Sequence, residues 1–241
     1  MKHDQGVHWF KSNGDLYWLK IAGEEKNSFF LRLSNICQKI FHFDFLKTNA
    51  TGMSPQLRLE HEKKVISYLS NKLQVVPNIV CEGEGFFVTK DLGVPLNEAP
   101  REIFSRPFLQ SLFMHLMDIH KHGIAHGRPS MRDIVVSQNR QLTFIDFEES
   151  AVKPNPSVMA RDFIFMILDL EQINLGKELK KETIKFWLKH EDHTIVKAFI
   201  KQTWFLRKSS YLARLVLLFK PSNRLSRQIV QTSEAIKDAL K

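Results

Sequence analysis

Two short apolar segments near the middle of the chain, each next to a carboxylate, constrain the fold most. Ile134–Val136 and Leu142–Ile145 are separated by a polar turn, which is the pattern of a β-hairpin. Asp133 precedes the first segment and Asp146 follows the second. Because a hairpin brings its two ends together, we expect these carboxylates to be neighbours. An acidic residue that emerges from a buried strand is held rigidly, as a metal ligand must be.

Such a carboxylate pair requires a nearby cation. Two carboxylates about 5 Å apart repel each other by roughly 3 kcal/mol at an effective dielectric constant of about 20. Mg²⁺ is one candidate, because proteins usually bind it through one or two carboxylates plus substrate phosphates. The guanidinium group of Arg128 or Arg132 is the other candidate, and it would make the cluster purely structural. The spacing alone does not choose between them.

The first third of the chain predicts a small sheet and two helices. Val7–Lys11 and Leu16–Ile21 are aromatic-rich segments on either side of Asn13-Gly14, a pair that tolerates positive φ and predicts a tight hairpin. Ser28–Thr48 is rich in Phe at helical spacing. We expect either a core helix or a basic, aromatic element at a membrane surface there.

A second helix and a further strand complete this part. Ser54 precedes Pro55, so the segment Pro55–Ser70 is predicted to be a helix capped by Ser54. Phe86–Lys90 has the pattern of a strand. Glycine and proline residues then interrupt both periodicities, which places a boundary near residues 91–100.

The rest of the chain is predicted to be mostly helical. Phe104–Lys121 has apolar residues at spacings of three and four, and Gly123 follows where a helix commonly ends. From Arg161 onward the pattern is again helical, and Pro221 interrupts the last long stretch. Four histidines cluster before the hairpin, but no cysteine accompanies them, so we do not expect a zinc site.

The segment from His120 to Ser150 resembles the catalytic loop and metal-binding strand of the protein-kinase-like fold. With His126 on the His of H-R-D-x-x-x-x-N, Asp133 falls on the Asn, and Asp146-Phe147-Glu148 falls on D-F-G. The chain is more similar to the bacterial lipopolysaccharide sugar kinases (Kdo and heptose kinases), which are related to RIO-type and aminoglycoside kinases. The resemblance covers about residues 7–170 and rests on Tyr17-Trp18-Leu19-Lys20, Glu62, Val76-Pro77, Lys90-Asp91-Leu92-Gly93, His122–Gly127 and Phe144–Glu148.

The resemblance implies an α+β, two-lobed fold with a reduced β-rich N-lobe (residues 1–92) and a mostly helical C-lobe (residues 93–241). It also implies ATP and Mg²⁺ as cofactors. The implied roles are phosphate contact for Lys20, pairing with that lysine for Glu62, the hinge under the adenine for Asp91 and Gly93, metal binding for Asp133 and Asp146, and bracing of the catalytic loop for Asp162. The alternatives without a functional role are that Lys20 is an exposed lysine at a strand end and that Glu62 is a solvated helix glutamate.

Three departures from the family pattern put catalysis in question. Arg128 stands where the family has the Asp that accepts the substrate proton, no glycine-rich loop precedes Lys20, and Glu148 replaces the glycine of D-F-G. A general base contributes about 10²–10⁴-fold, whereas phosphoryl transfer depends mainly on positioning and charge. One hypothesis is therefore an atypical phosphotransferase in which Arg128 contributes to the active site. The other is a pseudokinase in which Arg128 pairs with Asp133 or Asp146.

Spacing and charge suggest the partners. The short interval between Asp146 and Asp162 leaves little room for a peptide platform, which favours a sugar or glycolipid acceptor such as lipopolysaccharide. The 35 Lys and Arg against 26 Asp and Glu give a net charge of +9, which fits peripheral contact with an anionic membrane. No base-reading motif is present, so we do not expect nucleic acid. Two cysteines, no apolar run of bilayer length and no apolar core in Met1–Gln5 predict a cytoplasmic protein.

Overall fold

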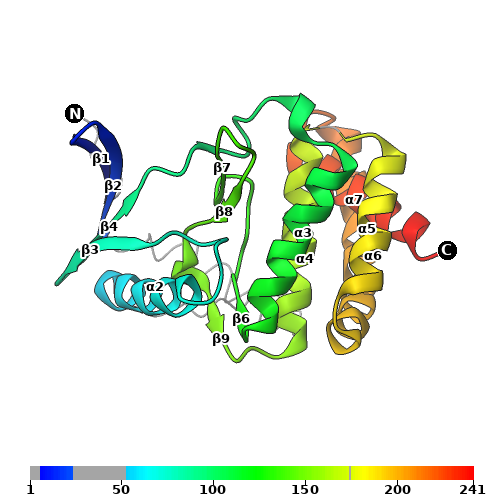
Figure 1. The fold of residues 1–241 in the computed structure, drawn as a ribbon. Coiled ribbons are helices and arrows are strands. Elements are labelled where there is room, and N and C mark those ends of the chain that lie inside the picture. Colours follow the sequence, from blue (N-terminus) through cyan, green and yellow to red (C-terminus); the bar gives the residue numbers. More distant parts are fainter. Residues whose placement is uncertain (1–5, 24–52, 174) are drawn as a thin grey trace.

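The computed structural model describes residues 6–23, 53–173 and 175–241, and it has two parts (Figure 1). A four-stranded antiparallel sheet and one helix form the smaller part, and helices with short strands form the larger part. This is the predicted α+β class, with a small β-rich part (the N-lobe) and a mostly helical part (the C-lobe). The Ser28–Thr48 prediction lies outside the described residues, and the lobe boundary at residues 92 and 93 stays a prediction.

The N-lobe sheet has the strand order β1-β2-β4-β3. Asn13 and Gly14 join the first two strands with φ of 52° and 86°, as the sequence predicts. Tyr17 pairs with Lys90 and Ile21 with Phe86, so β2 runs antiparallel to β4 along most of its length. The strands are β1 (Val7–Ser12), β2 (Asp15–Ile21), β3 (Ile79–Gly83) and β4 (Phe86–Lys90).

Helix α2 (Pro55–Ser70) lies beside the sheet and contacts both β3 and the turn that follows Asp146. Ser54 caps it as predicted, since its Oγ accepts a hydrogen bond from the Leu57 amide at 3.3 Å. On α2 the apolar Leu57 is exposed, whereas the charged Glu62 is buried.

The C-lobe begins with short strands. The predicted hairpin is present: β7 (Ile134–Val136) pairs antiparallel with β8 (Leu142–Phe144), and β5 (Val94–Pro95) pairs with the other edge of β7. A second small sheet pairs β6 (Ile124–Ala125) with β9 (Ala151–Val152). These two sheets hold the segments before Asp133 and after Asp146 close to each other.

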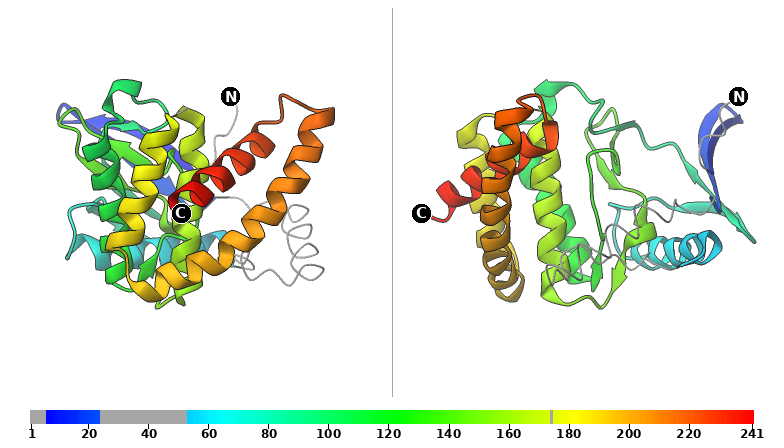
Figure 2. Two further views of the ribbon diagram at one scale, coloured as in Figure 1. Left: turned by 90° about the vertical axis from the view of Figure 1, so that its right-hand side faces the viewer. Right: turned by 180° about the vertical axis from the view of Figure 1, so that it is seen from behind.

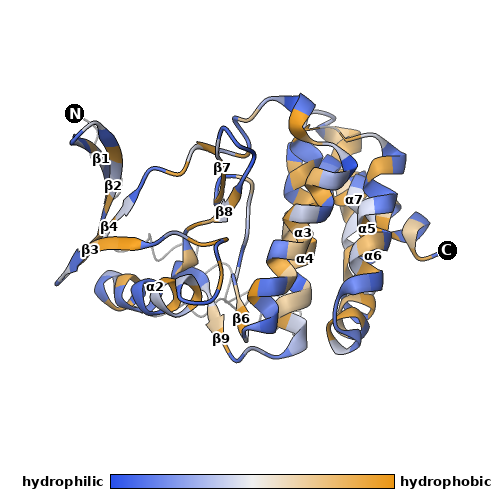
Figure 3. Ribbon diagram, in the orientation of Figure 1, coloured by the Kyte–Doolittle hydropathy of each residue, from blue (hydrophilic) through white to orange (hydrophobic). Residues whose placement is uncertain are grey.

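Five long helices make up most of the C-lobe, and Figure 2 shows them from two further directions. Pro221 separates the last two, as predicted. In Figure 3, α3 carries hydrophobic and hydrophilic residues on different faces. The helices are α3 (Arg106–Lys121), α4 (Pro156–Leu170), α5 (Lys177–His190), α6 (His193–Phe219) and α7 (Arg224–Ala239), and the short 3-10 turns are η2 (Arg101–Ile103), η3 (Phe147–Glu149) and η4 (Glu171–Ile173).

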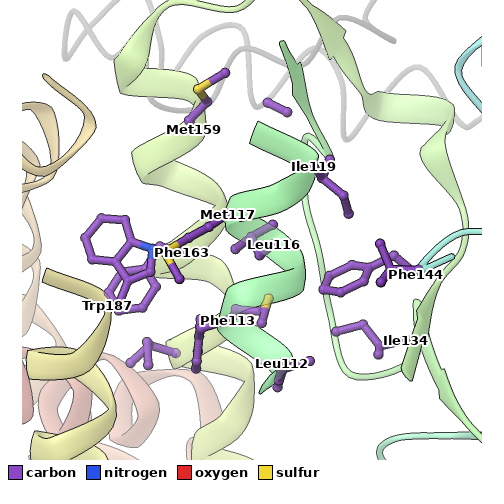
Figure 4. Close-up of a cluster of buried hydrophobic side chains, with 14 of the residues drawn as sticks. Leu112, Phe113, Leu116, Met117, Ile119, Ile134, Phe144, Met159, Phe163 and Trp187 are labelled. Carbon is purple, nitrogen blue, oxygen red and sulfur yellow. The ribbon is translucent and has the colours of Figure 1, made fainter. Parts of the chain in front are cut away.

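The hydrophobic core lies between these helices and the hairpin (Figure 4). The rings of Phe163 and Trp187 stack with centroids 3.8 Å apart, and Phe113 meets Phe163 edge-on at 5.1 Å. Phe144 of β8 is fully buried in the same core. Each such side chain contributes about 1.5–3 kcal/mol through burial. The segment that carries Asp146 is therefore anchored by the core immediately before it.

Gly93 makes the closest backbone approach at the start of the C-lobe, and its substitution tests this packing. Its φ is +126°, and a Cβ there would lie 2.1 Å from the Val136 carbonyl oxygen. We expect Gly93→Ala to lower the free energy of unfolding by more than about 2 kcal/mol. Gly123→Ala is the matched control, because Gly123 also has positive φ (+72°) but open space around it, so its cost is about 1 kcal/mol. Chemical denaturation of both variants measures the difference, and equal losses would contradict this packing.

Candidate functional site

Lys20 brings together three segments that are far apart in the chain. Its Nζ lies 2.9 Å from Oε1 of Glu62 on α2 and 2.7 Å from Oδ1 of Asp146 after β8. The Glu62 side chain is buried, whereas 41% of the Asp146 side chain is exposed. Lys20 is therefore not an exposed strand-end lysine, and Glu62 is not a solvated helix glutamate.

The electrostatics of this cluster follow from two carboxylates sharing one ammonium group. Burial alone would lower the pKa of Lys20, but Glu62 and Asp146 outweigh it and raise the pKa above its ordinary value. Burial is the main reason that the pKa of Glu62 is raised to about 7; Lys20 opposes this rise, and the charge of Asp146 adds to it. Lys20 therefore stays protonated between the two carboxylates.

Asp146 adopts an uncommon backbone conformation. Its φ and ψ are 64° and 62°, in the left-handed region that costs a residue other than glycine roughly 1–3 kcal/mol. The residues on either side fix it: the His126 ring contacts the Ile145 carbonyl oxygen at 2.9 Å, and Phe147 is fully buried with its ring 4.7 Å from that of His126. Strain that is retained in this way is typical of functional positions.

Asp133 lies within range of the Asp146 charge, as the hairpin predicts. Burial is the main reason that its pKa is raised, and the charge of Asp146 raises it further while His126 lowers it. Its Oδ2 accepts hydrogen bonds from the amide and the hydroxyl group of Ser130, at 3.0 and 2.7 Å. The Ile145 amide also donates to the Asp133 carbonyl oxygen at 2.8 Å, so the two arms of the hairpin are joined at this level.

Arg128 does not neutralise the carboxylate pair. Its guanidinium lies 3.0 Å from Oε1 of Glu149, and 61% of its side chain is exposed. The predicted pairing of Arg128 with Asp133 or Asp146 is therefore wrong, and Arg132 is exposed as well. The reason is local: Lys20 already contacts Asp146, and Ser130 already donates to Asp133.

Asp162 of α4 braces the loop that carries Arg128, as the resemblance implies. Its two carboxylate oxygens accept hydrogen bonds from the amides of His126 and Gly127, at 2.7 and 3.0 Å. The Arg161 guanidinium donates to the Gly127 carbonyl oxygen at 3.0 Å. Farther along, the Met131 amide donates to Oδ2 of Asp169 at 2.7 Å. Side chains of helix α4 thus fix the backbone of the loop, and these contacts do not involve the side chains of the loop.

His120 is a buried cation that the sequence pattern did not reveal. Its two ring nitrogens each lie 3.3 Å from a carboxylate, one from Asp162 and the other from Glu191. Burial alone would lower its pKa, but the two carboxylates outweigh it and raise the pKa to about 9. The protonated ring therefore helps to hold Asp162 in its bracing position.

Helix α2 is fixed to the segment after Asp146 by a second contact that sequence reasoning missed. The Nε2 atom of His61 lies 2.9 Å from both the carbonyl oxygen and Oγ of Ser150. His61 precedes Glu62 in α2, so this contact also sets the distance between Glu62 and Asp146. The sequence signal for this contact was the position of His61 directly before Glu62, the glutamate matched to the kinase pattern.

The two predicted hinge residues serve the junction between the lobes. Oδ1 of Asp91 accepts a hydrogen bond from the Trp18 indole at 2.6 Å, and the Asp91 amide donates to the Leu16 carbonyl oxygen at 2.8 Å. Gly93 packs against Val136 of β7. The structure therefore places Asp91 and Gly93 in the link from the sheet to the C-lobe.

Two negative findings apply to the part of the chain that the structure describes. No group of three or more His, Cys, Asp or Glu side chains there could by itself hold a metal ion. No helix there is long and apolar enough to cross a bilayer.

No family model matches the chain. An uncharacterised protein from Haemophilus influenzae is 25% identical over 228 residues, which cover 91% of this chain and 85% of that protein. Among solved structures, a co-crystal of WbdD with a kinase inhibitor matches 83% of this chain at 15% identity and a TM-score of 0.49. This chain spans 44% of that structure's length.

The His120 contacts predict a pH dependence of stability. The folded-state pKa of His120, about 9, exceeds the ordinary value of 6.5. Its stabilising contribution is therefore fully present below pH 6.5 and is lost as the pH rises through 9. We expect His120→Gln to cost on the order of 3 kcal/mol at pH 6 and much less at pH 10, as measured by urea denaturation.

His115, five residues earlier in the same helix, is the matched control. Burial lowers its pKa, so the contribution of the neutral ring is present above pH 6.5 and is lost as the pH falls. The penalty of His115→Gln should therefore shrink toward low pH, opposite to that of His120→Gln. If both penalties changed with pH in the same direction, the assignment of His120 as a buried cation would be wrong.

Proposed function

We propose that this chain is an atypical ATP-dependent phosphotransferase. The observation that carries the proposal is the position of Lys20 between the buried Glu62 and the half-exposed Asp146. A lysine that only stabilised the fold would be satisfied by Glu62 alone. The second carboxylate extends the cluster toward solvent, in a strained backbone that the surrounding structure retains.

The charges of the site fit a nucleotide with its divalent ion. Asp133 and Asp146 stand at the two ends of the hairpin, and the charge of Asp146 is one reason that the pKa of Asp133 is raised. Asp133 and Asp146 would hold Mg²⁺, which neutralises charge on phosphate oxygens when it is bound. Lys20, kept protonated by its neighbours, would donate to a phosphate oxygen.

Arg128 supports a contribution to the active site without a general base. Its guanidinium is exposed and oriented by Glu149, so it remains charged and open to an anion. It would contact a phosphate or an anionic acceptor. Because no carboxylate stands at this position, we expect transfer to be slower than in a kinase with the usual base, by about 10²–10⁴-fold.

The acceptor that we propose is a hydroxyl group of a sugar, on lipopolysaccharide or on another envelope glycolipid or small molecule. Only the turn η3 and the two-residue strand β9 lie between Asp146 and helix α4. This supports an acceptor that needs no extended peptide platform. A cytoplasmic enzyme in peripheral contact with the inner membrane would meet such a glycolipid.

The nucleotide site is tested by binding. We expect Mg-ATP to bind the wild type in calorimetry, and Lys20→Met and Asp146→Asn each to weaken binding by roughly 10–100-fold, since a hydrogen bond to a charged group contributes about 1.5–3 kcal/mol. Lys90→Met is the matched control, because Lys90 lies in the neighbouring strand and pairs with the exposed Asp15. If the wild type did not bind Mg-ATP, or if all three variants bound alike, the proposal would be rejected.

A pseudokinase is the second candidate, and the arginine at the base position favours it. Single-turnover transfer from γ-labelled ATP to lipopolysaccharide or to sugar acceptors distinguishes the two. Transfer that depends on Asp146 supports the enzyme. Tight binding of ATP without transfer to any acceptor supports a nucleotide-binding module.

A further inference from the structure

Helix α6 has two apolar stripes, and only one of them is buried. The buried stripe faces the C-lobe and contains Ile195, Phe199, Leu206 and Ala213. A second stripe runs along the outer side of the helix at spacings of 4, 7, 4 and 3 residues, which keep it on one face. Its members are between 49 and 74% exposed: Ile200, Trp204, Tyr211, Leu215 and Leu218.

The exposed stripe widens toward the end of the helix. Leu212, Phe219 and Leu225 are also exposed, and Phe219 reaches 85%. In Figure 2 (left), the last turns of α6 and the first of α7 form the tip of a hairpin that lies away from α3, α4 and α5. Scattered exposed apolar residues are normal, but a concentration of them on one side of the molecule indicates an interaction surface. We call these eight residues, seven in α6 and Leu225 in α7, the α6 outer face.

The charge of this region is as uneven as its hydrophobicity. Residues 193–233 contain eight Lys and Arg and no Asp or Glu, so they account for eight of the nine net positive charges of the chain. Some of these cations lie among the apolar residues: Nζ of Lys208 is 3.9 Å from the centroid of the Trp204 ring. Arg214 also pairs with Glu234 of α7 at 2.7 Å. The cations are Lys197, Lys201, Arg207, Lys208, Arg214, Lys220, Arg224 and Arg227.

We propose that the α6 outer face binds the surface of an anionic phospholipid bilayer, with α6 lying in the plane of the interface. This element combines the features of interfacial helices: aromatic and aliphatic side chains on one face, basic side chains among and beside them, and no acidic residue. Each Lys or Arg near an anionic surface contributes about 1 kcal/mol, and long basic side chains can reach the headgroups while their stems cover apolar surface.

Other occupants fit this surface less well. A second copy of the chain would bring two faces of the same strong positive charge together. Nucleic acid would pair with the cations, but its phosphate backbone would not bury the exposed Leu215, Leu218 and Phe219 side chains. The bilayer matches both properties. This inference does not rest on the proposed phosphotransferase, because none of its residues belongs to the Lys20 cluster.

Flotation of the full chain with lipid vesicles tests the proposal. We expect binding to vesicles of phosphatidylglycerol and phosphatidylethanolamine, loss of binding to pure phosphatidylcholine, and weakening by 0.5 M salt. The triple variant Leu215→Ser, Leu218→Ser, Phe219→Ser should lower the partition coefficient at least 10-fold. Leu57→Ser is its control, because Leu57 is exposed on α2 in the N-lobe.

Charge and depth are tested separately. Lys201→Glu with Lys208→Glu should reduce partitioning at least 10-fold, whereas Lys185→Glu with Lys189→Glu on α5 should leave it nearly unchanged. The fluorescence of the wild type should shift to the blue on binding, and Trp204→Phe should remove that shift. All these side chains are exposed, so thermal melts should show that the variants fold.

Several outcomes would overturn the proposal. These are equal binding to neutral vesicles, flotation unaffected by the apolar and charge variants, or a dimer in light scattering that the triple variant abolishes. Binding to duplex DNA with higher affinity than to anionic vesicles, unaffected by the triple variant, would assign the surface to nucleic acid instead.

Discussion

A single ammonium group shared by two carboxylates determines how the two parts of this structure meet. Lys20 comes from the sheet, Glu62 from α2, and Asp146 from the hairpin of the C-lobe. Glu62 is buried beside Lys20, and Asp146 is held in a strained backbone next to the core. Because of these constraints, a change in any one of the three positions would alter the placement of the other two.

Local patterns predicted the elements that carry this site. Asn13-Gly14 specified the first hairpin, Ser54-Pro55 specified the start of α2, and the apolar segments on either side of a polar turn specified the hairpin between Asp133 and Asp146. Each of these signals acts over a few residues, so it is readable without the fold. The approach of Lys20 to Glu62, across 42 residues, came from resemblance to known kinases rather than from the pattern itself.

Tertiary contacts decided the features that the sequence could not show. His120 has the same local setting as other helix histidines, and only the packing of α4 and of the end of α5 brings Asp162 and Glu191 to its ring. The sequence allowed Arg128 to pair with Asp133 or Asp146, but in the folded chain it pairs with Glu149. The sequence predicted helices in this region but not which apolar stripe of α6 is buried, because hydrophobic periodicity shows that a face is apolar without showing what covers it.

A structure of the protein with Mg²⁺ and a non-hydrolysable ATP analogue would test the central claim most directly. The account predicts a metal ion bound by Asp133 and Asp146, with Nζ of Lys20 in contact with a phosphate oxygen and still paired with Glu62. A complex in which the nucleotide lies elsewhere, or in which Asp146 keeps Lys20 and binds no metal, would contradict it.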